Sequence, residues 1–120
     1  MAARIAGMVL RARSREASGK FYEALGLILN EHAHGGPMHF EMGPNADDLV
    51  FEIYRGSINF SEDALMIEVD SLNEALRTCE GFKIFPLEEI KEVGDMKFTY
   101  ILDLDDRSVM LLEKTARPTV

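Results

Sequence analysis

The chain contains the same local pattern twice, an apolar strand followed by a short capped helix, and this duplication constrains the fold most strongly. The first copy is an apolar strand at residues 4–12 followed by a helix at residues 14–27. The second is a strand at residues 64–69 followed by a helix that starts at Ser71, 57 residues after Ser14. A chain of 120 residues suits one domain, so the two copies are expected to share a core.

Both helices have recognisable ends and an apolar stripe. Ser14 is the expected N-cap of the first helix, and Ser71 with Glu74 forms a capping box in the second. Gly26 and Gly81 are the expected stops. The stripe expected to cover the sheet consists of Ala17, Phe21, Ala24 and Leu25 in the first helix, and of Leu72, Ala75, Leu76 and Cys79 in the second. Cys79 is therefore interpreted as a small core residue and not as a nucleophile.

Each half of the chain is predicted to run strand, helix, strand, strand, strand. The further strands are expected at 27–34, 38–42 and 49–54 in the first half, and at 82–85, 96–104 and 108–114 in the second. In the segment 86–93, Leu87, Ile90 and Val93 have helical spacing, but the repeat calls for extended chain, so this segment is interpreted as extended with a helix as the alternative. Within a single domain over 1–120, this gives modules at 4–55 and 64–114 joined by a linker at 56–63. Turns are expected at 34–37 and 43–48, and the end of the chain from Thr115 is expected to be loose.

Composition excludes several classes of partner. The net charge is −8 and the sequence pI is about 4.8, with no basic cluster, so neither nucleic acid nor an anionic membrane is expected to bind. The single cysteine excludes an internal disulfide. With no run long and apolar enough for a signal peptide or a membrane span, a cytoplasmic location is predicted.

Three motifs resemble those of the vicinal oxygen chelate superfamily, which includes glyoxalase I, bleomycin-resistance proteins and extradiol dioxygenases. They are FYEALGL at 21–27, VFEIY at 50–54 and LDLDDRSVMLLEK at 102–114, and the resemblance extends from about Arg4 to Lys114. It implies an α+β fold of two tandem βαβββ modules that form a cupped, partly open eight-stranded barrel with the helices outside and the ligand in the cup.

The resemblance also implies where a divalent metal would be bound in enzymes of this superfamily. The four ligand positions correspond to Gly7, Glu52, Ala64 and Met110. Glycine and alanine offer no donor, and a thioether is a poor ligand for a hard divalent ion. No metal at the family site and no cofactor are therefore expected.

The residues that share the face of these positions have the composition of a small-molecule pocket. The predicted ligand-binding residues are Val9, Arg11, Val50, Glu52, Tyr54, Met66, Glu68, Met110 and Leu112. By resemblance to metal-free bleomycin-resistance proteins, the chain is predicted to bind a small organic ligand, with a cation favoured by the acidic charge, as a homodimer that acts by sequestration.

Two alternatives remain open at the level of sequence. One is an enzyme, either a lyase or isomerase that uses Glu52 as its base or a dioxygenase-type enzyme that uses a histidine cluster. That cluster would comprise His32, His34 and His39 beside Glu41, because a two-residue turn at Gly35 and Gly36 sets His32 opposite His39. The other is a non-catalytic dimeric scaffold, in which the apolar side chains fill the core and the histidines are simply solvated.

Overall fold

A computed structural model describes residues 2–32, 39–42, 49–55 and 63–115, and for His32, His39 and Met42 it describes the backbone only. The predicted turns at 34–37 and 43–48, His34, residues 56–62 of the predicted linker and residues 116–120 lie outside this part. The chain divides into two compact units. We call residues 6–64 the N-terminal unit and residues 1–5 with 65–120 the C-terminal unit.

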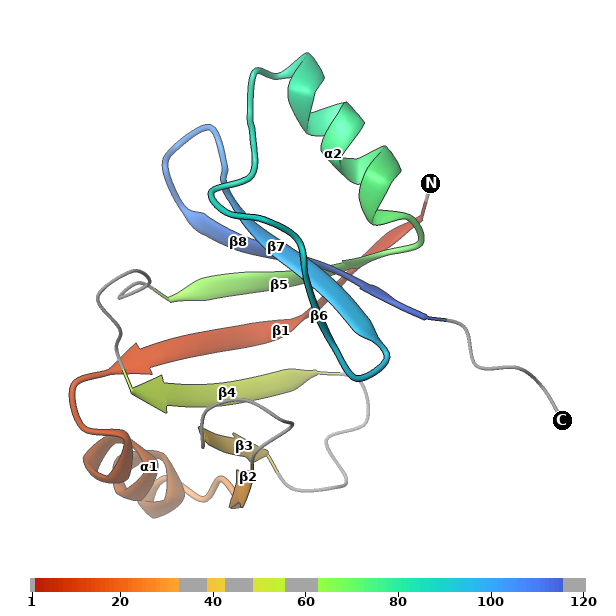
Figure 1. The fold of residues 1–120 in the computed structure, drawn as a ribbon. Coiled ribbons are helices and arrows are strands. Elements are labelled where there is room, and N and C mark those ends of the chain that lie inside the picture. The colour runs from red at the N-terminus through yellow and green to blue at the C-terminus, as the bar shows by residue number, and fades with distance from the viewer. Residues whose placement is uncertain (1, 33–38, 43–48, 56–62, 116–120) are drawn as a thin grey trace, which may run out of the picture. The chain divides into compact units, whose positions relative to one another are not determined.

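The order strand, helix, strand, strand, strand occurs twice, as predicted (Figure 1). The first set is β1 (Ala3–Ala12), α1 (Arg15–Ala24), β2 (Leu29–His32), β3 (His39–Met42) and β4 (Val50–Arg55). The second set is β5 (Ala64–Val69), α2 (Leu72–Gly81), β6 (Lys91–Val93), β7 (Met96–Leu102) and β8 (Ser108–Lys114). The eight strands form a mixed, open sheet in the order β2-β3-β4-β1-β5-β8-β7-β6, which confirms the α+β class. In the described ranges no helix is long and apolar enough to cross a membrane.

The strand predicted at 82–85 is absent, and only the end of the extended segment predicted at 86–93 becomes a strand, β6. The backbone groups just after α2 close the helix instead, with the N–H groups of Lys83 and Ile84 donating to the carbonyls of Glu80 and Cys79. Lys83 has a positive φ of 59°, which turns the chain away from an extended path. The prediction failed because the local apolar composition does not reveal how a helix ends.

In the N-terminal unit, α1 packs against β3 and β4. Ser14 caps it as predicted, its hydroxyl accepting the N–H of Ala17 at 3.1 Å. The ring of Tyr22 packs edge-on against Phe51 of β4 with 5.1 Å between centroids. Gly19 is buried, and a Cβ built there would lie 2.9 Å from the ring of Phe40. Gly19 therefore allows the helix to approach β3 closely.

The predicted buried face of α1 is wrong. Phe21 and Leu25 are 59% and 69% exposed, and Ala17 and Ala24 are also exposed. The helix is rotated so that Gly19, Tyr22 and the partly buried Arg15 meet the aromatic rings of the sheet. The guanidinium of Arg15 lies 5.2 Å from the centroid of the Phe40 ring. Contacts of Gly19, Tyr22 and Arg15 with aromatic rings therefore set the orientation of α1, and the apolar stripe does not.

The C-terminal unit has a conventional apolar core between α2 and its strands. Leu72 and Ala75 are 1% and 4% exposed, and Leu76 and Cys79 pack against the same cluster, as predicted. The strands contribute Ile67, Val69, Ile101, Val109 and Leu111 to this core. Burial raises the pKa of the Cys79 thiol, which agrees with a core role for this residue.

The N-terminal end of α2 is stabilised by two polar side chains. The Ser71 hydroxyl accepts the N–H of Glu74 at 3.2 Å, which confirms the predicted N-cap. A carboxylate oxygen of Glu113 on β8 accepts the N–H of Leu72 at 2.8 Å and so fastens the helix to the sheet. The helix ends at Gly81 as predicted, but the residue with positive φ is Lys83 and not the glycine.

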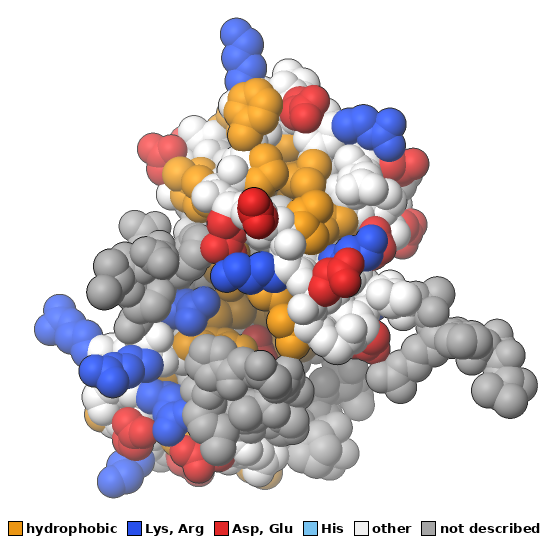
Figure 2. Space-filling model, viewed as in Figure 1, with side chains coloured by type: hydrophobic (Ala, Val, Ile, Leu, Met, Phe, Trp, Pro, Cys, Tyr) orange, Lys and Arg blue, Asp and Glu red, His pale blue; other side chains and the backbone are white. Residues whose placement is uncertain are grey.

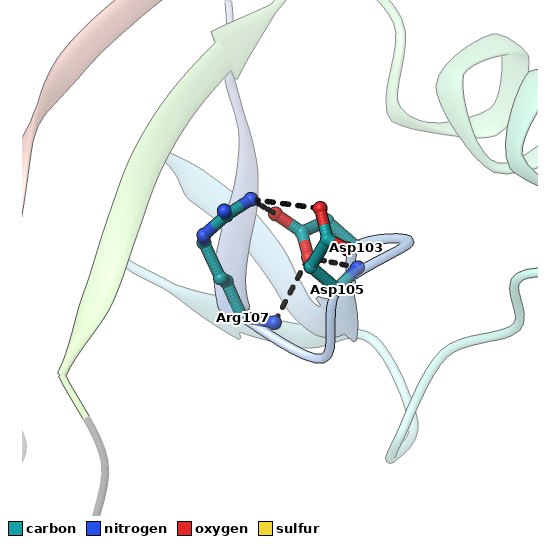
Figure 3. Close-up of polar contacts among 3 residues, drawn as sticks. All are labelled: Asp103, Asp105 and Arg107. Carbon is teal, nitrogen blue, oxygen red and sulfur yellow. Dashed lines mark hydrogen bonds and ion pairs between the residues drawn. The ribbon is translucent and has the colours of Figure 1, made fainter.

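The turn between β7 and β8 is organised by one carboxylate (Figure 3). Asp103 accepts the backbone N–H groups of Asp105 and Arg107, each at 2.9 Å, and pairs with the Arg107 guanidinium at 3.2 Å. The hydrogen bond from the Arg107 N–H is the main reason that the pKa of Asp103 lies below its ordinary value. The first part of the LDLDDRSVMLLEK motif is therefore a closed turn that fixes the β7–β8 register.

Apolar side chains also remain exposed on the segment that links α2 to β6. They are Phe82, Phe85, Leu87 and Ile90. Figure 2 shows hydrophobic side chains interspersed with acidic and basic ones on this side of the C-terminal unit. Leu87 is nevertheless tied to β7, because its N–H donates to the carbonyl of Tyr100 at 2.8 Å.

Candidate functional site

The predicted ligand-binding residues of the N-terminal unit lie on two adjacent parallel strands, β1 and β4. The register pairs Val9 with Glu52 and Arg11 with Tyr54. Val9 is buried, whereas Arg11, Val50, Glu52 and Tyr54 are half-buried. Because Phe51 packs under α1 and side chains alternate along a strand, Val50, Glu52 and Tyr54 belong to the face opposite α1. We call this surface the β1–β4 face.

Arg11 is fixed by two contacts on the β1–β4 face. Its guanidinium carbon lies 4.8 Å from the centroid of the Tyr54 ring, within the range of a cation–π interaction. Its backbone N–H donates to the carboxylate of Asp63 at 3.0 Å. A partly buried cation stacked on an aromatic ring is thus placed one strand away from Glu52.

A second carboxylate lies directly across from Glu52. In the antiparallel pair β3–β4, Glu41 is the Cα partner of Glu52, and in β2–β3 Asn30 is the partner of Glu41. Like charges directly opposite each other weaken a strand pair. This juxtaposition is the main feature that sequence reasoning missed. In both HFEM and VFEIY a glutamate follows a phenylalanine, but the sequence does not show that the two glutamates are partners until β3 and β4 are known to pair.

Gly7, the position that the resemblance assigns to the first metal ligand, lies where two strands approach closely. It pairs with Val50, and a Cβ at Gly7 would lie 2.6 Å from the Val50 carbonyl carbon and 2.7 Å from its nitrogen. Its φ of 153° is also one that side-chain-bearing residues rarely adopt. The close approach of β1 to β4 therefore excludes a ligand residue at this position.

In the C-terminal unit the predicted site residues are mostly apolar and buried. Met66, Met110 and Leu112 are all buried, and Tyr100 is the cross-strand partner of Met110. The only charged member, Glu68, pairs with Arg4 at 3.0 Å and with Lys114 at 3.6 Å. This charge is therefore matched by two cations of the same unit.

The remaining superfamily metal positions do not supply a ligand set. Ala64 and Met110 are buried residues without an oxygen or nitrogen donor, which leaves Glu52 as the sole carboxylate of the four. Among the side chains that the structure describes, no group of three or more His, Cys, Asp or Glu residues is arranged to hold a metal ion.

The predicted hairpin register is confirmed. In the antiparallel pair β2–β3, His32 is the Cα partner of His39. Glu41 follows His39 by two positions, so strand alternation assigns both positions to one face. The third histidine of the predicted cluster, His34, lies outside the described residues.

No protein-family model and no curated protein sequence matches the chain. Solved structures match along its whole length. The alignment with a hypothetical protein from Bacillus halodurans C-125 covers 100% of this chain and 100% of that protein at 12% identity, with a TM-score of 0.74. A variant of methylmalonyl-CoA epimerase from Streptomyces coelicolor covers 98% of both chains at 11% identity, with a TM-score of 0.69.

Glyoxalase I from Zea mays matches 94% of this chain and 43% of its own length at 12% identity, with a TM-score of 0.68. The protein therefore has the α+β fold of these solved structures, which include glyoxalase I, and this confirms the fold that the three sequence motifs predict. Methylmalonyl-CoA epimerase and glyoxalase I are among the solved structures that share this fold. At these identities the likeness establishes the fold alone.

Proposed function

We propose that the protein binds a small organic cation on the β1–β4 face without a metal at the superfamily position, and that it acts by ligand binding or sequestration. The observation that carries this proposal is Gly7, where the backbone of Val50 occupies the space that a metal-ligating side chain would need. Glyoxalase or dioxygenase chemistry at that position lacks its ligands. What the unit offers instead is a half-buried polar face.

The charge of this face supports a cationic ligand. Glu41 and Glu52 are cross-strand partners, so the residues of this face include two carboxylates, and negative charge favours the approach of a cation. Tyr54 already holds the Arg11 guanidinium 4.8 Å from its ring centroid, so a cation–π contact forms on this face within the chain itself. The protein as a whole carries a net charge of −8, which favours the approach of a cation.

A matched set of three compounds tests the proposal: benzyltrimethylammonium, benzyl alcohol and benzoate, each added with EDTA present. Benzyltrimethylammonium is expected to raise the melting temperature, since a ligand at 100 times its Kd stabilises a protein by about 2.7 kcal/mol. Benzyl alcohol should give a smaller rise and benzoate none. A response that needs added divalent metal, or one that is equal for all three compounds, would contradict the proposal.

Glu52→Gln tests the site itself, with Glu31→Gln as the matched control. Glu31 is on neighbouring strand β2 but pairs with Arg15 of α1 at 3.0 Å, on the other side of the sheet. The rise in melting temperature should fall in Glu52→Gln and persist in Glu31→Gln. An equal rise in melting temperature in both variants would show that Glu52 does not bind the ligand.

An enzyme is the second candidate, and the placement of Glu41 across from Glu52 favours it. Two neighbouring carboxylates are a common means of dividing acid and base roles. In that case Glu52 is the base of a lyase or isomerase, and Glu52→Gln abolishes turnover of a carbon acid substrate. If Glu52 only complements the charge of a ligand, Glu52→Gln changes the affinity for that ligand, and neither the variant nor the wild-type chain shows turnover. A homodimeric, cytoplasmic protein remains part of the proposal.

A further inference from the structure

The segment between α2 and β6 carries large apolar side chains that are exposed. Phe82, Phe85, Leu87 and Ile90 are 62%, 60%, 48% and 40% exposed. Together they present on the order of a few hundred Å² of apolar surface, a patch size that often marks an interaction site on a monomer. We call residues 82–90 the α2–β6 segment.

The backbone of the α2–β6 segment is held by the rest of the C-terminal unit. The N–H of Leu87 donates to the carbonyl of Tyr100 at 2.8 Å, and the hydroxyl of the fully buried Thr99 donates to the carbonyl of Glu88 at 3.0 Å. Ile84 packs against the core. A partner therefore meets a preorganised surface, which reduces the entropy lost on binding.

The charge around these apolar side chains is acidic. Residues 80–93 contain four glutamates and two lysines, namely Glu80, Glu88, Glu89 and Glu92 against Lys83 and Lys91. The whole chain carries a net charge of −8. This charge favours a cationic partner and opposes a second copy of the same acidic chain.

Glu88 adds a specific acceptor for a cation. Its Oε2 pairs with the ammonium of Lys91 at 3.3 Å. Its Oε1 is the one buried side-chain oxygen or nitrogen within the described residues that has no hydrogen-bond partner. An unsatisfied buried acceptor carries a desolvation cost. A cationic donor that draws this oxygen outward offsets the cost, and Oε1 loses no hydrogen bond.

We propose that the α2–β6 segment is a docking surface for a short peptide segment of a partner protein, in which lysine or arginine residues alternate with apolar ones. The apolar residues of the partner pack on Phe82, Phe85 and Ile90, and its cations meet Glu88 and Glu89. A stable dimer takes about 800 Å² from each partner, more than this patch offers, which also disfavours a second copy. The proposal concerns the C-terminal unit and does not rest on the ligand of the β1–β4 face.

Fluorescence anisotropy of a labelled peptide of alternating lysine and leucine, titrated with the full chain, tests the proposal. Saturable binding that weakens with added salt is expected. Two control peptides, one with glutamate in place of lysine and one with serine in place of leucine, should bind about tenfold more weakly or less. No saturable binding, or equal binding of the peptides with leucine and with serine, would overturn the proposal.

Phe85→Ser tests the apolar contact, with Leu104→Ser as the matched control. Leu104 is 74% exposed in the turn between β7 and β8 of the same unit. Phe85→Ser should weaken binding of the lysine–leucine peptide by about tenfold, whereas Leu104→Ser should leave it unchanged. Equal affinities of the two variants, or a dimer in sedimentation velocity that Phe85→Ser dissociates, would overturn the proposal.

Glu88→Gln tests the acceptor, with Glu23→Gln as the control for net charge, because Glu23 is an exposed residue of α1. Glu88→Gln should weaken binding of the lysine–leucine peptide by about threefold or more, and Glu23→Gln should not. An equal loss in both variants would show that binding follows net charge alone, which would contradict docking on this segment.

Discussion

The two helices of the duplicated pattern have similar sequences of caps and apolar residues, yet they are buried in different ways. In α2 the aliphatic stripe packs into the sheet, with Leu72 1% exposed. In α1 the corresponding stripe faces outward, with Phe21 59% exposed. The sheet below α1 offers the rings of Phe40 and Phe51, and Gly19 lets the helix approach them. What a helix buries therefore depends on its partner as much as on its own pattern.

The predicted site residues of the two units also differ in burial and charge. In the C-terminal unit Met66, Met110 and Leu112 are buried, and the carboxylate of Glu68 is paired with two cations. In the N-terminal unit the β1–β4 face is half-buried and carries Glu52 and Arg11. The apolar face belongs to the core of its unit, whereas the polar one carries the proposed site. Each of the following predictions tests one side of these contrasts.

Gly7→Ala has the largest expected effect. The new Cβ would overlap the backbone of Val50, which cannot move away as a flexible side chain can, so the parallel β1–β4 pairing should be disrupted. We expect a loss of about 3 kcal/mol or more in the free energy of unfolding, at the upper end for overpacking. Chemical denaturation measures it. Gly81→Ala is the control, since no atom lies within 4 Å of a Cβ at that position. A Gly7→Ala variant as stable as this control would contradict the close approach.

Leu72→Ala and Phe21→Ala test the contrast between the helices directly. Leu72 is fully buried, so its truncation should cost about 2–5 kcal/mol. Phe21 is larger but exposed, and its truncation should change stability by no more than about 0.5 kcal/mol. Both values come from urea unfolding followed by circular dichroism. Similar losses in the two variants would show that the α1 stripe is buried in solution.

Substitutions just after the two helices should change stability by smaller amounts, and in opposite directions. After α1 the residue with positive φ is Gly26, at 110°, whereas after α2 it is Lys83, at 59°. Gly26→Ala should destabilise the protein by about 1 kcal/mol, and Lys83→Gly should stabilise it by up to about 1 kcal/mol. Thermal unfolding of the two variants checks the pair. A destabilised Lys83→Gly variant would mean that the lysine side chain contributes more than its backbone strain costs.

The smallest effect concerns the turn between β7 and β8. Because the pKa of Asp103 is lowered in the folded state, its ionised form stabilises the protein fully above the unfolded value, about 3.9 for an aspartate. The contribution decreases as the pH falls below that value and is lost once the pH passes the lowered folded pKa. The stability difference between the wild-type chain and Asp103→Asn should therefore shrink towards acid. A difference that does not change from pH 6 to pH 2 would contradict this account.

The sequence predicts the order of elements well because caps and apolar periodicity are local. Ser14, Ser71 and the alternation of residues 49–54 needed no tertiary information. The orientation of α1 was not predictable, since it depends on Phe40 and Phe51, which belong to strands elsewhere in the chain. The end of α2 at Gly81 was predicted, but the positive φ of Lys83, which replaces the strand expected at 82–85, was not.

The candidate site shows the same limit. The cross-strand pairing of His32 with His39 follows from a short turn between two strands, and the structure confirms it. The pairing of Glu41 with Glu52 requires knowing that β3 lies next to β4, which no local pattern states. Likewise, the sequence shows that Gly7 lacks a donor, but only the structure shows that Val50 leaves no room for one.

The central claim is that the β1–β4 face of the N-terminal unit binds a small organic cation without the superfamily metal. The most direct test is a two-dimensional amide NMR titration of the chain with benzyltrimethylammonium in the presence of EDTA. Saturable shifts concentrated on the amides of Val9, Arg11, Glu52 and Tyr54, and lost in Glu52→Gln, are the predicted result. Shifts confined to the exposed stripe of α1 or to residues 82–90, or no saturable shifts at all, would contradict the claim.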